Sequence, residues 1–258
     1  MGPANGAKFR WPARDASAED ILRWAVDEFG DRLAISTSFQ ATGMAILDMA
    51  ACITGGDVRV FSLDTGRIHQ ETYDLIEQVR KRYGIEVEML TPDGYELSRM
   101  LTLHGPNLFY DSVAKRRLCC EIRKVRPLKR KLATLDAWIT GLRQSQSQAR
   151  EGVSPVELDE EHGGILKIAP LASWTEQDVW DYIRRNDVPY HKLYDQRYTS
   201  IGCAPCTRET KPGEKARAGR WWWEEDDADK ECGIHVSPSG QIRRSFDILL
   251  EEVLPRVR

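Results

Sequence analysis

Hydrophobic and polar positions alternate along the first 190 residues in a way that predicts strands and helices in turn. Runs of apolar residues bounded by polar ones indicate buried strands at 32–38, 58–64, 85–90 and 136–141. Stretches with apolar residues three and four positions apart indicate helices at 17–29, 41–51, 69–83 and 175–186. Ser17 stands where a helix N-cap is expected, and Gly84 where a helix ends.

This order of elements predicts an α/β fold. Strands that alternate with helices form right-handed βαβ units, which give a mostly parallel sheet with helices on both faces. Ligands of such sheets bind beyond the carboxyl ends of the strands. Three strand ends are therefore candidate site elements, and they read "STSFQ", "LDTGR" and "TGLRQSQSQAR".

The second half of the chain follows another pattern. Residues 151–170 predict two short strands around the turn "DEEHGG". From Thr207 onward glycine, charge and tryptophan dominate, and regular packing signals become sparse. We predict one domain over residues 1–207 and a mobile C-terminal segment over 208–258.

Composition narrows the class of protein. The chain has 258 residues, 41% hydrophobic and 30% charged, as in an ordinary globular protein. A net charge of -3 argues against a nucleic-acid-binding protein, and the sequence has no apolar run long enough for a membrane span. The N-terminus lacks the apolar core of a signal peptide, so we expect a cytoplasmic location.

Cysteine spacing is the most specific chemical signal. Cys119 and Cys120 are adjacent, and 82 residues later comes "CAPC", with Cys203 and Cys206. Four thiolates suit an iron–sulfur cluster or zinc, and a redox dithiol is a third reading. Adjacent cysteines are awkward ligands for one tetrahedral ion, which favours the cluster. Cys52 follows an apolar helical run and is expected to be buried.

Positive charge surrounds the paired cysteines in "KRRLCCEIRKVRPLKRK". A basic helix is usually a solvated face, and we expect this for residues 129–131. Lys124 differs because it lies one helical turn after Cys120 and can share its side. It is a candidate to bind an anionic substrate and to balance the charge of thiolates.

The motif "KECGIH" supplies a further cysteine that a four-cysteine site does not need. Cys232 has Lys230 and His235 nearby in sequence and is a candidate nucleophile with a lowered pKa. The alternative is an incidental surface cysteine. The acidic run "EEDDADKE" would oppose a thiolate there, unless the segment brings Cys232 to a basic pocket.

Together these motifs closely resemble the assimilatory sulfonucleotide reductases, in particular the adenylyl-sulfate (APS) reductases. The resemblance runs through "STSF", "LDTGRIH", "CCEIRKVRPLKRKL", "WITG", "IGCAPCTR", "GRWWW" and "KECGIH". It implies the Rossmann-like fold of adenine-nucleotide α-hydrolases. It also implies reduction of adenylyl sulfate to sulfite and AMP in sulfate assimilation and cysteine biosynthesis.

The resemblance further implies the parts of the mechanism. One [4Fe–4S] cluster would be held by Cys119, Cys120, Cys203 and Cys206. Cys232 would form an S-sulfocysteine intermediate, with His235 beside it. Thioredoxin, or a glutaredoxin-like dithiol, would then release sulfite. A homo-oligomer is expected only by family analogy.

Substrate-binding positions follow from the same resemblance. They are Lys124, Arg150, Arg217 and Arg220 around the phosphosulfate, Ser36 and Ser38 in the phosphate loop, Leu63 and Gly141 at adenine and ribose, and Asp64 and Arg67 in the "LDTGR" loop.

Three alternatives remain at this stage. A reductase of 3′-phosphoadenylyl sulfate (PAPS), or one that takes both substrates, belongs to the same class; we prefer APS because PAPS reductases generally lack the four cysteines. A zinc-bearing nucleotide-binding module without redox activity would be a different class. A sulfurtransferase or tRNA thiolase would need an adenylating "SGGxDS" loop, which the sequence lacks.

Overall fold

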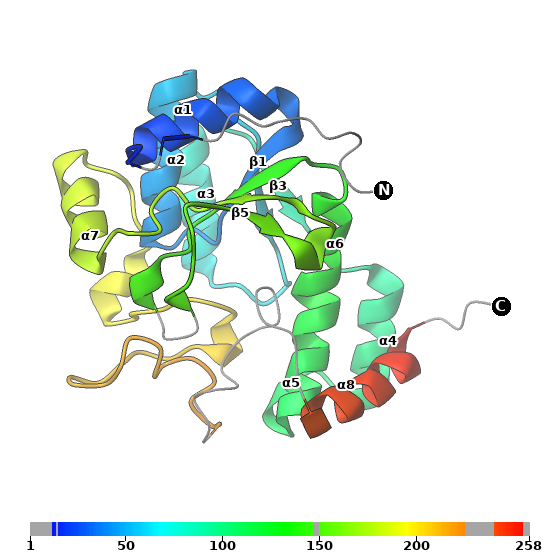
Figure 1. Ribbon diagram of the computed structural model, residues 1–258. Helices are drawn as coiled ribbons and strands as arrows, with labels where there is room; N and C mark the ends of the chain where they lie inside the picture. Colours follow the sequence, from blue (N-terminus) through cyan, green and yellow to red (C-terminus); the bar gives the residue numbers. More distant parts are fainter. Residues whose placement is uncertain (1–11, 14, 147–149, 225–239, 255–258) are drawn as a thin grey trace. The chain divides into compact units, whose positions relative to one another are not determined.

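The computed structural model describes residues 12–13, 15–146, 150–224 and 240–254, without the side chains of 240–242 (Figure 1). The chain divides into two compact units, which we describe separately. Unit 1 takes its described residues from Met1–Ser62, His69–Met89 and Lys131–Arg197. Unit 2 takes them from Leu63–Ile68, Leu90–Arg130 and Tyr198–Arg258. The domain boundary expected at residue 207 stays a prediction.

A six-stranded sheet is the centre of unit 1. Its strand order is β3-β2-β1-β4-β6-β5. The strands are β1 (Leu33–Ser36), β2 (Val60–Leu63), β3 (Val87–Leu90), β4 (Ala137–Thr140), β5 (Val156–Asp159) and β6 (Ile165–Ile168). β1 is parallel to β2 and β4, and β4 to β6, whereas β5 is antiparallel to β6. The predicted mostly parallel α/β fold is confirmed, as is the predicted pair of short strands in 151–170.

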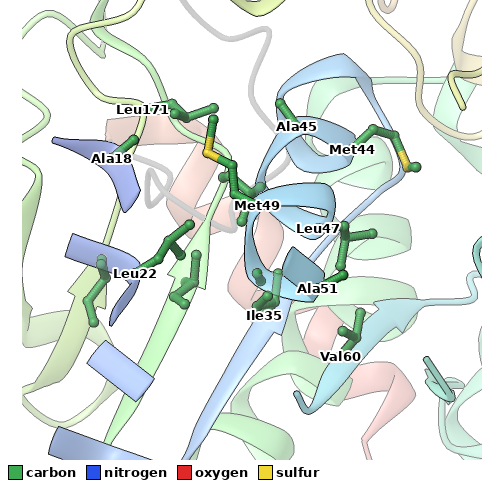
Figure 2. Packing of buried hydrophobic residues seen from close by; sticks show 14 of the residues in the cluster. Ala18, Leu22, Ile35, Met44, Ala45, Leu47, Met49, Ala51, Val60 and Leu171 are labelled. Carbon is green, nitrogen blue, oxygen red and sulfur yellow. The ribbon is translucent and has the colours of Figure 1, made fainter. Parts of the chain in front are cut away.

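Helices α1 (Ala18–Phe29), α2 (Ala41–Thr54), α3 (Gln70–Tyr83) and α7 (Glu176–Arg185) belong to unit 1. Ser17 caps α1 through a capping box with Asp20, and Gly84 ends α3 in the left-handed conformation, φ +70°. α2 packs against both α1 and α7, and its residues 41–51 are all buried. Figure 2 shows Leu22, Ile35 and Met49 in this core, so α1, β1 and α2 share one apolar interior.

Unit 2 is helical, and much of it was not expected from the sequence. α4 (Gly94–His104) and α8 (Gly240–Val253) were not predicted, and both lie beside other helices of the unit, α8 against α5 (Val113–Cys120) (Figure 1). A π-helix, Glu121–Val125, joins α5 to α6 (Arg126–Leu132). The core of this unit includes Met100, Leu118, Trp221 and Val253. No helix among the described residues is long and apolar enough to span a membrane.

Two predictions about single residues were wrong. Cys52 is exposed, because the last turn of α2 emerges from the core that covers residues 41–51. Lys131 is buried, with its ammonium group paired with Glu88, so the expectation of a solvated face over 129–131 fails there. In both cases the surrounding tertiary structure decides burial, which local periodicity does not record.

A buried histidine makes the stability of unit 1 depend on pH in a predictable way. His191 is fully buried; its Nε2 donates to the Thr72 hydroxyl at 3.0 Å, and its Nδ1 accepts from the Leu193 amide at 3.3 Å. Burial, with a smaller contribution from the charge of His69, lowers the pKa of His191 to about 4. The folded state therefore binds fewer protons than the unfolded state between pH 4 and 6.5.

The stabilisation from neutral His191 is present above pH 6.5 and is lost as pH falls toward 4. We predict that lowering the pH from 7.5 to 5.0 decreases the free energy of unfolding of the wild type by about 2 kcal/mol more than that of His191→Asn. Urea unfolding at the two pH values measures this difference. Equal pH dependence in both proteins would show that His191 is not the group responsible.

Candidate functional site

The first candidate loop, "STSFQ", connects β1 to α2 in unit 1. Ser36 is the last residue of β1, and the hydroxyl of Ser38 accepts a hydrogen bond from the Gln40 side chain at 3.0 Å. Phe39 is buried and has φ +58°, while its amide donates to the Thr37 hydroxyl at 3.0 Å. Such a conformation persists only where the surroundings hold it. The loop therefore delivers the chain to the α2 N-terminus, where backbone N–H groups favour an anion.

The loop after β4 lies against the beginning of α2. A Cβ on Gly141 would stand 3.4 Å from the amide nitrogen of Gly43, so glycine permits this close approach. Arg143 is also buried here, and its Nε donates to the Thr42 hydroxyl at 3.0 Å. Burial lowers the pKa of Arg143, although its ordinary value is so high that it remains a cation.

Gln146 links two of the predicted site residues within this loop. Its Nε2 donates to the Gly141 carbonyl at 3.1 Å, and its Oε1 accepts from the Arg150 guanidinium at 2.6 Å. Neither Gln146 nor Arg143 was singled out in the sequence. The only signal was the run of polar residues "LRQSQSQAR", in which several glutamines and serines were equally eligible.

The "LDTGR" loop follows β2, whose last residue is Leu63, and is described within unit 2. The Asp64 carboxylate accepts from the Gly66 amide at 2.7 Å, and Gly66 has φ +68°, which forms a tight turn. Arg67 donates to Asn107 at 3.1 Å and lies 5.2 Å from the Phe109 ring centroid. Asp64 and Arg67 therefore shape the loop and attach it to unit 2.

Unit 2 brings the four cysteines of the two motifs to one pocket. Cys119 and Cys120 end α5, Cys203 is the N-cap of a short 3₁₀ turn, Ala204–Cys206, and Cys206 ends that turn. All four line the same pocket. Among the described residues that line it, none is acidic and five are cations: Arg67, Arg116, Arg123, Lys124 and Arg220.

Lys124 reaches this pocket from the π-helix Glu121–Val125. π-helical turns are rare and occur often at functional sites. This one follows directly on the adjacent cysteines, so the same helix presents Cys119, Cys120 and Lys124 to one cavity.

Thr65 connects the "LDTGR" loop to the cysteines. Its hydroxyl lies 3.3 Å from Sγ of Cys203, and its carbonyl accepts a hydrogen bond from the buried guanidinium of Arg123. Sequence reasoning missed Thr65 because its partner stands 138 positions away along the chain.

The pocket shifts the pKa values of its thiols in different directions. Burial works to raise the pKa of Cys203, but the positive charge of Lys124, the Thr65 hydrogen bond and the charge of Arg220 outweigh it, so the pKa of Cys203 is lowered. Burial raises the pKa of Cys119 and of Cys206 to about 12, with neighbouring thiols adding to the effect. Four thiolates are therefore favoured only when further positive charge enters the pocket.

The hydrogen-bond donors of the pocket wall fit an iron–sulfur cluster. Among the described residues, three buried nitrogens of the pocket wall have no hydrogen-bond acceptor: Nε of Arg123, Nε of Arg220 and Nε1 of Trp221. Buried donors are normally satisfied, so their arrangement fits an acceptor such as a thiolate- or sulfide-rich centre. In the part of the chain that the structure describes, no three His, Cys, Asp or Glu side chains are grouped for a single metal ion.

Arg220 is held in a narrow slot of the same wall. Its guanidinium lies 4.5 Å from the Trp221 ring centroid, and a Cβ on Gly202 would overlap it. Only 6% of Arg220 is exposed, which makes it a fixed cation with an unused donor. Arg217 is half-buried in the preceding turn, and its carbonyl accepts from the Arg220 amide at 2.9 Å.

The predicted site residues are thus distributed over both units. Ser36, Ser38, Gly141 and Arg150 belong to unit 1, and the cysteine pocket with Lys124, Arg217 and Arg220 belongs to unit 2. Cys232 and His235, predicted as nucleophile and neighbour, lie outside the described residues.

Comparison with known proteins identifies the family. Residues 32–209 match the phosphoadenosine phosphosulfate reductase domain, and these residues include both cysteine motifs. The chain belongs to this family. The resemblance inferred from the sequence motifs is therefore confirmed.

Several proteins of known name are similar to this chain over most of its length. An adenosine 5′-phosphosulfate reductase of Burkholderia cepacia is 47% identical over 84% of this chain and 86% of its own. A reductase of the same name from Allochromatium vinosum is 44% identical over 87% of this chain and 86% of its own. A crystal structure of a Candida auris phosphoadenylyl-sulfate reductase has a TM-score of 0.64 at 34% identity, covering 75% of this chain and 91% of that one.

The Arg220 slot yields a test. In Gly202→Ala the new Cβ would displace the guanidinium, which can swing out while the backbone stays in place. We predict that inorganic sulfate binds about tenfold more weakly, as in Arg220→Ala, since one charge-assisted hydrogen-bonding group is lost. Calorimetric titration measures this. Gly94→Ala is the control, because its Cβ meets no atom within 4 Å; equal affinity in both variants would contradict the slot.

Proposed function

We propose that this protein reduces adenylyl sulfate to sulfite and AMP, with a thiol of the chain as nucleophile and a dithiol protein as reductant. The observation that carries the proposal is the pocket in unit 2. There the adjacent cysteines and the Cys-x-x-Cys pair share one wall with Lys124 and Arg220. Similarity supports the proposal as well, because relatives that are 44–47% identical to this chain are named adenosine 5′-phosphosulfate reductases.

The reaction proceeds through a covalent intermediate. The Cys232 thiolate attacks the sulfur of adenylyl sulfate, and the bond from sulfur to the bridging oxygen breaks. AMP leaves with that electron pair, and Cys232 carries a thiosulfonate. A thiol of thioredoxin, or of a glutaredoxin-like protein, then attacks Sγ of Cys232 and releases sulfite. Its second thiol resolves the mixed disulfide, so the dithiol supplies the two electrons.

The anion-binding residues fall into two sets under this proposal. Lys124, Arg217 and Arg220 of unit 2 bind the phosphosulfate and neutralise charge that develops on the leaving phosphate. In unit 1, Arg150 adds a further cation, and Ser36 and Ser38 line the loop at the α2 N-terminus. Leu63 and Gly141 meet adenine and ribose through backbone groups. His235 orients Cys232 or protonates the leaving group.

Cys119, Cys120, Cys203 and Cys206 would hold one [4Fe–4S] cluster. When bound, the cluster would supply the positive charge that keeps the four cysteine side chains ionised, and so would fix the field around Lys124. Lys124 needs a fixed place because it binds substrate. The free thiols that this chemistry requires fit a reducing compartment, so we propose the cytoplasm as the location.

A second candidate substrate is 3′-phosphoadenylyl sulfate. It is favoured by the name of the family itself and by the Candida auris enzyme, which is 34% identical. The same nucleophile and the same cations would serve, since only the ribose 3′-position differs. A zinc-bearing module without redox activity is a more distant alternative.

The cluster proposal predicts the metal content. Protein purified without oxygen should contain about four iron and four sulfide per chain, and Cys119→Ser or Cys206→Ser should lose most of both. Cys52→Ser is the matched control, since that cysteine is exposed on α2 and should leave iron unchanged. Iron and acid-labile sulfide assays measure this. Stoichiometric zinc without iron would favour the zinc-bearing module.

The nucleophile proposal predicts a covalent adduct. Incubation with adenylyl sulfate and no reductant should add one sulfonate group to Cys232, detectable by intact-protein and peptide mass spectrometry. Cys232→Ser should remove the adduct, whereas Cys52→Ser should keep it. An undiminished adduct in Cys232→Ser would assign the nucleophile elsewhere.

A further inference from the structure

The basic segment around the paired cysteines contains a buried cation that the proposed reaction does not use. Arg116 lies on α5 with a side chain that is 0% exposed. Its Nε donates to Oε1 of Glu224 at 2.5 Å, and its terminal nitrogen donates to Oε2 at 3.0 Å. The Glu224 side chain is only 6% exposed, so this is a buried, two-pronged ion pair.

Burying such a pair is costly, and apolar replacements of similar volume are often as stable or more so. Stability alone therefore does not account for it. Its partners stand 108 positions apart in sequence, and the pair fixes the turn that ends at Glu224 against α5. A role in fixing geometry is the best-supported use of a buried ion pair.

The ion pair between Arg116 and Glu224 fixes the position of Trp221. Trp221 is 1% exposed and has φ +43°, an unusual value for a bulky residue, which must be imposed by its surroundings. The Trp221 amide donates to the Cys206 carbonyl at 3.2 Å, and the Glu224 amide donates to the Trp221 carbonyl at 2.9 Å. The turn 221–224 is thus held both to the Cys-x-x-Cys loop and, through Glu224, to Arg116.

Trp221 in turn supports Arg220. The guanidinium groups of Arg116 and Arg220 each lie 4.5 Å from the Trp221 ring centroid, within the range of cation–π attraction. The two cations are therefore within about 9 Å of each other in a buried wall, where salt screens little. Glu224 neutralises one of them and so removes repulsion that would displace the other.

We propose that Arg116 and Glu224 are positioning residues for the reaction: through Trp221 they hold Arg220 in place to bind the phosphosulfate of the substrate. The inference rests on the proposed function, because it takes Arg220 as a substrate-binding residue. The proposal assigns neither Arg116 nor Glu224 a contact with the substrate, because both act through Trp221. The charge of Glu224, the first residue of the acidic run 224–231, is neutralised by Arg116.

A double-mutant cycle between Glu224→Gln and Arg220→Ala tests this, with the affinity for adenylyl sulfate as the readout. Binding is measured by calorimetry on iron-loaded protein in a Cys232→Ser background, so that no turnover occurs. We expect Glu224→Gln alone and Arg220→Ala alone each to weaken binding about tenfold or more. In the Arg220→Ala background, Glu224→Gln should weaken it by less than about twofold, because its effect passes through Arg220.

Glu96→Gln is the matched control. Glu96 makes a similar two-pronged pair with Arg126 in the same unit, at 2.8 and 2.7 Å, away from the pocket wall. Glu96→Gln should lower the melting temperature without changing the affinity for adenylyl sulfate. Arg116→Lys keeps the charge but loses the fork and the flat surface over Trp221, and should weaken binding as Glu224→Gln does.

The double replacement Arg116→Met with Glu224→Leu repeats the cycle without an unpaired buried charge, should Glu224→Gln fail to fold. Unchanged affinity in the folded Glu224 variant, or fully additive effects with Arg220→Ala, would overturn the inference while leaving the proposed function intact. Normal affinity in Arg220→Ala would overturn both the inference and this part of the substrate assignment. Absence of binding in the parent protein would contradict the proposed function itself.

Discussion

Neutralising the charge of four neighbouring thiolates is the constraint on which unit 2 depends. Cys119, Cys120 and Cys206 are buried, and burial raises the pKa of Cys119 and Cys206. The described residues of the wall provide five cations and no carboxylate, and they already lower the pKa of Cys203. Two of these cations, Lys124 and Arg220, are also proposed to bind the phosphosulfate of the substrate. Charge compensation and substrate binding are therefore two uses of one arrangement.

That arrangement also explains the local structure of the basic segment. A π-helical turn directly after the paired cysteines carries Lys124, while Arg116 and Arg123 are buried on the same continuous helical stretch. Each of these two buried cations has a defined partner, since Arg123 donates to the Thr65 carbonyl and Arg116 donates to Glu224. Lys129 and Arg130 are exposed as expected of a solvated helix, whereas Arg116 and Arg123 are buried cations with individual partners.

Sequence predicted the fold of unit 1 well, because its signal is local. Ser17 caps α1, Gly84 ends α3, and short apolar runs mark the strands, so periodicity alone locates them. The cysteine motifs likewise carry their chemistry in their spacing. α4 and α8 were missed, although Asp93 is the N-cap of α4 and its carboxylate accepts from the Glu96 amide at 3.0 Å. Both helices pack against other helical parts of unit 2, and local sequence does not record that packing.

What sequence could not provide are the partners of single side chains. Nothing in "WWWE" indicates that Glu224 meets Arg116, and nothing in "LDTGR" indicates that Thr65 meets Cys203. Gln146 is one of several polar residues in its loop, and only the structure distinguishes it by its bonds to Gly141 and Arg150. These are tertiary contacts between distant positions, which composition and periodicity do not encode.

We propose that this cysteine-lined, cation-rich pocket serves the reduction of adenylyl sulfate. The most direct measurement is sulfite release by the iron-loaded protein with reduced thioredoxin, comparing adenylyl sulfate with 3′-phosphoadenylyl sulfate. We expect sulfite and AMP in equal amounts, with kcat/KM higher for adenylyl sulfate by about 100-fold or more. An equal or higher kcat/KM for the 3′-phosphorylated nucleotide, or no sulfite from either, would contradict it.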